Sequence, residues 1–105
     1  MRGIVVNGLR ALLLGALLMV STGCVGTVYA VKSLGAASSL EEAKVLGAPE
    51  LAEYEYYYAH EMLDKAKEEA ASASYGDAID FADRAQEYAE KAIELSKGAH
   101  RGAGR

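Results

Sequence analysis

Apolar and polar residues recur with a helical period through the second half of the chain. Over residues 49–72 apolar side chains return every three or four positions, and acidic and basic residues fill the opposite face. Residues 77–96 repeat the pattern, and Asp77 is placed to cap that helix. A short connection containing Gly76 separates the two stretches, which is typical of an antiparallel helical hairpin. The pattern predicts an all-α fold built on this hairpin.

A shorter helix over residues 40–46 is expected to precede the hairpin. Ser38 or Ser39 can cap its first turn, and a Glu three residues later can close a capping box. Gly47 then ends the helix, because glycine readily adopts the left-handed conformation found after many helices. Pro49 begins the next helix, at a position where its missing N–H costs nothing.

Small side chains line the faces that the two long helices are expected to turn toward each other. Alanine returns every three or four residues in both, which allows the helices to approach closely. The predicted core rows of the first helix are Tyr56, Ala59, Leu63, Ala66, Ala70 and Ala73, and Leu51, Tyr54, Tyr58, Met62 and Ala66. Those of the second are Ala78, Ala82, Ala85, Ala89 and Ala92, and Phe81, Ala85, Tyr88, Ala92 and Leu95.

The first 23 residues have the pattern of an export signal. Arg2 and Arg10 form a basic start, and residues 11–20 are an uncharged apolar run. Ten helical residues rise about 15 Å, half of the roughly 30 Å hydrocarbon core of a bilayer. The pattern therefore favours a signal peptide over residues 1–23, with cleavage between Gly23 and Cys24.

Cys24 and the small residues before it resemble the lipobox of bacterial lipoproteins. The resemblance implies that diacylglycerol is attached to the Cys24 thiol, that the leader is cut after Gly23, and that the new amine is acylated. Thr22 fits this pattern, whereas Ser21 stands where the family usually has Leu. The alternatives are a chance cysteine in an uncleaved anchor or in an ordinary secretory leader. Two or three acyl chains would hold the protein stably on a membrane.

The segments on either side of the hairpin domain, which we place at residues 40–97, are expected to be flexible. Residues 24–39 are small and mixed in character, which suits a tether between the lipid and the folded part. The last segment, residues 98–105, is Gly-rich and basic. We expect it to be a disordered tail that follows a helix end at Gly98.

Length and charge exclude some functions. The 105 residues are enough for one domain with a small core, so stabilisation by a partner protein or a second copy is expected. The net charge is −4, and two of the eleven basic residues, Arg2 and Arg10, lie in the leader. An acidic module gains nothing from counterion release on DNA or RNA, so nucleic-acid binding is not expected.

No set of residues in the sequence predicts catalysis or a cofactor. His60, Glu61 and Asp64 have the outline of a zinc-protease helix. The second histidine of that motif is missing, however, and the only other histidine, His100, lies in the tail. A solvated helix face with a weak His60–Asp64 pair is the simpler interpretation. We expect no catalytic residue, no metal, no cofactor and no small-molecule substrate.

Four tyrosines near the start of the first long helix are the clearest candidate contact residues. They are Tyr54, Tyr56, Tyr57 and Tyr58. Four side chains within five helical positions point in several directions, so they cannot all enter a two-helix core. They pack against the 40–46 helix or another copy, or they form a docking patch for an envelope protein or a glycan, since tyrosine is enriched at interfaces.

Residues 40–95 resemble the small alanine-rich bacterial lipoproteins grouped as domain of unknown function 4398. The resemblance rests on the aromatic cluster, the alanine-rich face and the turn at Tyr75–Ala78. It implies a helical envelope module and brings no active residue with it. The second helix is also similar to that of a tetratricopeptide repeat, but only one such unit is present where at least three normally share a core.

Two functional hypotheses follow. The first is a lipid-anchored, non-catalytic protein-interaction or scaffold module of the cell envelope, with the tyrosines as the contact surface. The alternative is a structural lipoprotein that self-associates and spaces membrane and cell wall. Val25 follows Cys24, and the absence of Asp there favours the outer membrane, facing the periplasm, by the sorting rule of enteric bacteria.

Overall fold

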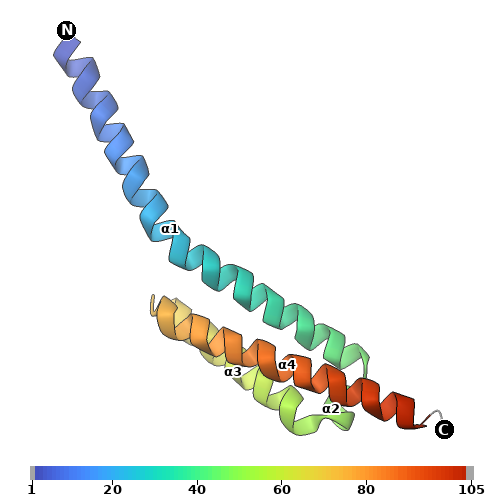
Figure 1. Cartoon of the computed structure of the whole chain (residues 1–105). Helices are drawn as coiled ribbons and strands as arrows, with labels where there is room; N and C mark the ends of the chain where they lie inside the picture. Colours follow the sequence, from blue (N-terminus) through green and yellow to red (C-terminus); the bar gives the residue numbers. More distant parts are fainter. Residues whose placement is uncertain (1, 104–105) are drawn as a thin grey trace.

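The computed structural model describes residues 2–103, and these form four helices joined by short turns. They are α1 (Arg2–Val45), α2 (Ala48–Leu51), α3 (Glu53–Ala71) and α4 (Tyr75–Ala103), as Figure 1 shows. No strand occurs within this described range. The predicted all-α fold is confirmed.

The second half of α1 and the helices α3 and α4 pack as an elongated three-helix unit. Helix α3 returns antiparallel to α4, as the predicted hairpin requires, and α1 runs alongside α4 in the same direction (Figure 1). Three side-chain contacts record this parallel register, because their residue numbers rise together on both helices. They are Lys32 with Asp83, Ser39 with Gln86, and Glu42 with Lys97. The molecule measures 82 × 24 × 14 Å.

Alanine dominates the core, as the sequence predicts. The row Ala78, Ala82, Ala85, Ala89 and Ala92 of α4 is completely buried. On α3 the inward row of Tyr56, Ala59, Leu63 and Ala66 is buried together with Met62. The second predicted row of each helix is not fully inward, since Leu51 and Tyr54 of the first and Leu95 of the second are exposed. Ala73, predicted in the first row, is exposed in the turn after α3. Small core side chains allow the helix axes to approach closely.

The turn after α1 follows the prediction at Gly47. Its φ of 86° lies in the left-handed region, and its N–H donates to the carbonyl of Lys44 at 3.0 Å. Pro49 lies in the first turn of α2, also as expected. The predicted helix over 49–72 is nevertheless interrupted at Ala52, where φ is −143° and ψ is 54°. This bend lets both Ala48 and Ala52 be buried against the bundle.

The connection between α3 and α4 is shorter than predicted. Ser74 N–H donates to the carbonyl of Glu69 at 2.9 Å, and Ala73 N–H donates to that of Ala70 at 3.0 Å. These two bonds make a Schellman motif, with Ala73 at a φ of 60° in the place usually taken by glycine. Helix α4 starts at Tyr75, so Asp77 lies in its first turn and does not cap it.

The prediction of a flexible tether over residues 24–39 was wrong. These residues are helical within α1, and the predicted short helix over 40–46 is the end of that same helix. The physical reason is tertiary burial: Ala36, Leu40 and Ala43, spaced four and three residues apart, are buried in the shared core. Packing of one face stabilises a helix more than the weak propensity of its Gly and Ser residues destabilises it.

The predicted helix end at Gly98 was also wrong. Helix α4 continues through it to Ala103, so residues 98–103 of the predicted disordered tail are helical. His100 Nε2 lies 2.7 Å from the carbonyl oxygen of Leu46, which connects this last part of α4 to the end of α1. Residues 104–105 of the predicted tail lie outside the described residues.

The first half of α1 projects beyond the three-helix unit (Figure 1). It includes the predicted signal peptide, and its apolar side chains Val5, Leu9 and Leu12–Leu14 are exposed. Within residues 2–103, no helix combines the length and the hydropathy needed to cross a membrane.

Candidate functional site

The four candidate tyrosines separate into anchored and exposed members. Tyr56 is 7% exposed and belongs to the core, and Tyr58 is half-buried against it. Tyr54 is 65% exposed and Tyr57 54% exposed. Successive helical residues point about 100° apart, so neighbours on one helix face different surroundings. The expectation that the four could not share one core is met, and the surface members are Tyr54 and Tyr57.

Three aromatic rings, those of Tyr54, Tyr58 and Tyr88, pack together on one side of α3. The Tyr58 ring lies 4.4 Å from the ring of Tyr88 on α4, measured between centroids. Tyr54 stacks on Tyr58 at 5.8 Å and meets Tyr88 edge-on at 6.3 Å. Aromatic pairs at these separations attract each other beyond the effect of buried area alone. Exposed Tyr54 is therefore held by two rings.

Tyr57 is supported from the other side of α3. Its ring lies 5.1 Å from that of Tyr56, in an edge-on arrangement, and Tyr56 in turn contacts the imidazole of His60 at 5.7 Å. Because Tyr56 is buried, Tyr57 rests on a fixed neighbour. The two exposed rings are thus positioned by separate contacts on either flank of the helix.

A shallow surface hollow lies between these rings. Its volume is about 730 Å³. Its lining residues, which we call the tyrosine surface, are Glu53, Tyr54, Tyr57, Tyr58 and Glu61. Aromatic faces with hydroxyl groups suit amphipathic contacts, and the two carboxylates favour a basic partner over an acidic one. The hollow offers a contact surface, and its residues do not form a nucleophile and base pair.

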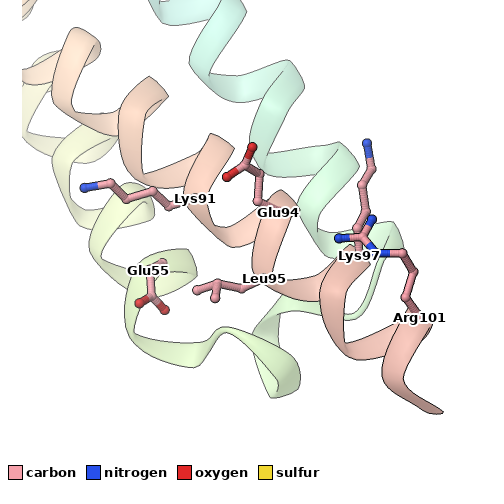
Figure 2. Close-up of a pocket in the computed structure, with 6 residues that line it drawn as sticks. All are labelled: Glu55, Lys91, Glu94, Leu95, Lys97 and Arg101. Atoms are coloured by element: carbon pink, nitrogen blue, oxygen red, sulfur yellow. The ribbon is translucent and has the colours of Figure 1, made fainter. Parts of the chain in front are cut away.

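A second hollow, of about 650 Å³, lies along α4 and is shown in Figure 2. Glu55 of α3 lines it together with residues of α4, and Lys97 and Arg101 lie at one end (Figure 2); the other α4 residues are Lys91, Glu94 and Leu95. The hydrogen bond with the Glu87 carboxylate raises the pKa of Lys91, which also lies 4.4 Å from the centroid of the Tyr88 ring. Sequence reasoning missed this hollow, because it depends on where α3 passes α4.

Cys24 is exposed on α1, so its thiol is accessible to a modifying enzyme. The structure does not describe the side chains of residues 21–23, the predicted lipobox positions before Cys24. Lipidation and cleavage at this point therefore stay predictions from the sequence.

The residues of the zinc-protease outline lie along one exposed face of α3. His60, Glu61 and Asp64 are all exposed, and His60 packs against the ring of Tyr56. Glu61 pairs with Lys65 at 3.9 Å on the same helix. In the part of the chain that the structure describes, no group of three or more His, Cys, Asp or Glu residues is placed to hold a metal ion.

Comparison of the chain with protein-family models, with curated proteins and with solved structures finds no match. The resemblance to the alanine-rich lipoproteins stays a prediction from the residues that carry it.

Proposed function

We propose that this protein is a lipid-anchored lipoprotein of the bacterial cell envelope that acts as a non-catalytic interaction module. One observation carries the proposal. The rings of Tyr54 and Tyr57 are exposed to solvent, and each is held in place by contact with a neighbouring tyrosine ring. An aromatic side chain with little freedom loses little entropy on binding, so it is well suited to anchor a partner.

The proposed location in the cell envelope rests on the pattern of N-terminal residues. A basic start, an apolar run and an exposed Cys24 after small residues support export and lipid attachment. Position 25 is Val and not Asp, which supports attachment to the outer membrane with the folded part in the periplasm. The resemblance of residues 40–95 to small alanine-rich lipoproteins supports the same envelope setting.

The partner that fits the tyrosine surface is a protein segment with apolar and basic side chains. The rings of Tyr54 and Tyr57 supply apolar area, and Glu53 and Glu61 supply negative charge at its rim. Basic groups of a partner would pair with these carboxylates, which sets orientation more than affinity. An open hollow of about 730 Å³ suits a short segment of such a partner.

The test is site-specific photo-crosslinking in the native bacterium. A photoreactive phenylalanine analogue replaces Tyr57, and the matched control carries it at Glu68, which is exposed on the same helix outside the tyrosine surface. We expect a discrete cross-linked product with a second envelope protein at position 57 and none at position 68. A product twice the mass of the chain would favour the structural, self-associating alternative, and equal labelling at both positions would contradict a specific surface.

A further inference from the structure

Helix α1 connects the predicted lipid site directly to the folded core. It runs without interruption from Cys24 to Val45, and Ala36, Leu40 and Ala43 on the same helix are buried against α4. A continuous helix transmits orientation, whereas a flexible tether does not. The three-helix unit therefore has a fixed direction relative to Cys24.

The end of the unit nearest Cys24 contains two short stretches without a charged residue, which are followed by Lys32 on α1 and by Asp77 in the first turn of α4. Residues 24–31 of α1 and residues 71–76 around the α3–α4 turn contain no Asp, Glu, Lys or Arg. The structure brings these two distant segments together, since the rings of Tyr29 and Tyr75 lie 6.2 Å apart. We call these two segments the uncharged end; in Figure 1 the α3–α4 turn lies beside the middle of α1.

The uncharged end also exposes apolar side chains of α1 close to Cys24. Val25 and Val28 are 45% and 44% exposed, and Val31 is 66% exposed. At 1.5 Å per residue, Val28 lies about 6 Å and Val31 about 10 Å along the helix from Cys24. If α1 stands upright on the bilayer that holds Cys24, both valines lie within about 10 Å of the bilayer surface, close to the thickness of the headgroup layer.

We infer that the uncharged end rests on the bilayer surface that receives the acyl chains of Cys24. The inference rests on the proposed lipidation of that cysteine. Acyl chains attached to Cys24 hold the bilayer within one or two helical turns of Val25, Val28 and Val31. Tyr29 and Tyr75 then lie at the headgroup level, where tyrosine is enriched because one end of its side chain is apolar and the other polar.

The same geometry holds the tyrosine surface away from the membrane. Tyr54 contacts Tyr88 of α4, two residues beyond Gln86, which bonds to Ser39 of α1. Ser39 lies about 22 Å along the helix from Cys24. The opposite end of the unit is charged, with Glu42 and Lys97 in contact there at 3.6 Å. A bilayer at the uncharged end thus leaves the partner surface open.

The test uses the lipidated mature protein, purified from membranes and placed in phosphatidylethanolamine and phosphatidylglycerol vesicles. Cys24 is the only cysteine of the chain, so once it is lipidated an introduced cysteine is the only reactive thiol. An environment-sensitive fluorophore is attached to Ser72→Cys in the uncharged end or to Glu50→Cys at the opposite end, both exposed positions. Some of the lipids carry a nitroxide quencher in the headgroup.

We expect the fluorophore at position 72 to lose most of its emission to the nitroxide lipids and that at position 50 to keep nearly all of it. Adding Val28→Lys and Val31→Lys is expected to restore most of the emission at position 72. Val45→Lys, an 84% exposed valine on the same helix, is the matched control and should leave the quenching unchanged.

Mass measurement of the same preparation separates the two proposals. A lipidated Cys24 with equal quenching at positions 72 and 50 would overturn the docking inference alone. Quenching at position 72 that persists after both lysine substitutions would overturn it as well. So would evidence that Val31 contacts a second copy of the chain and not the bilayer. An unmodified Cys24 would overturn the lipoprotein proposal and, with it, this inference.

Discussion

The side-chain amide of Gln86 on α4 donates a hydrogen bond to the hydroxyl oxygen of Ser39 on α1 at 2.8 Å. Ser39 is thereby a contact residue within a continuous helix, and the cap expected at this point is not formed. Next to it, Leu40 is 5% exposed. The contact makes α1 the third helix of the folded unit, so a stability measurement can test the assignment.

Substitution of Leu40 by alanine should destabilise the protein strongly. The side chain is buried in the shared core, and removal of a buried leucine costs about 2–5 kcal/mol. Leu34→Ala is the control on the same helix, because Leu34 is 70% exposed and its loss should cost no more than about 0.5 kcal/mol. Chemical unfolding of the full chain in mild detergent measures both. Equal small effects would mean that residues 24–45 do not pack as described.

Gly98 and Gly47 should respond to alanine in opposite directions. Gly98 lies inside α4, with only the end of the Arg101 side chain near a new Cβ, so Gly98→Ala should stabilise the protein by about 1 kcal/mol. Gly47 has a φ of 86°, and an L-residue in that region costs about 1–2 kcal/mol. Thermal melts of the two variants provide the comparison. A destabilising Gly98→Ala would restore the helix end predicted from the sequence.

Ser96→Ala should leave stability unchanged or raise it. Ser96 is completely buried, and its hydroxyl has no hydrogen-bond partner among the described residues. An unpaired buried polar group costs about 1–3 kcal/mol, so removing it should recover up to about 1 kcal/mol after the loss of packing volume. Ser38→Ala, at an exposed position of α1, is the control and should change stability by less than about 0.5 kcal/mol. A loss above 1 kcal/mol at position 96 would show that the hydroxyl is paired.

Alanine substitutions at Tyr57 and Tyr58 should affect partner binding and protein stability differently. Tyr58→Ala removes the 4.4 Å contact with Tyr88 and should cost about 2 kcal/mol of unfolding free energy. Tyr57→Ala removes a 54% exposed ring and should cost about 0.5 kcal/mol or less, while abolishing the cross-linked partner product obtained from a probe at Tyr54. If Tyr57→Ala left that product at full yield, the tyrosine surface would not be the contact.

The hairpin was predictable because its apolar period is strong. Ala78, Ala82, Ala85 and their successors repeat at helical spacing over the whole of α4, and such a row can be buried only by a close neighbour. The end at Gly47 was predictable from the conformational freedom of glycine. These features depend on residues close in the sequence.

The extent of α1 and the roles of the tyrosines depend on distant contacts. Gly26, Gly35 and three serines suggest a weak helix, and only the burial of Leu40 with its neighbours against α4 outweighs that. The spacing of Ala36, Leu40 and Ala43 carried the signal for this packing. Which tyrosines face solvent could not be read from the sequence, because the bend at Ala52 rotates the start of α3.

The most direct test of the account is the intact mass of the N-terminal peptide of the mature protein from purified membranes. We expect a peptide that begins at Cys24 and carries diacylglycerol on its thiol, followed by the helical segment that leads into the core. A Cys24 without lipid, or a peptide that still begins at Met1, would contradict it.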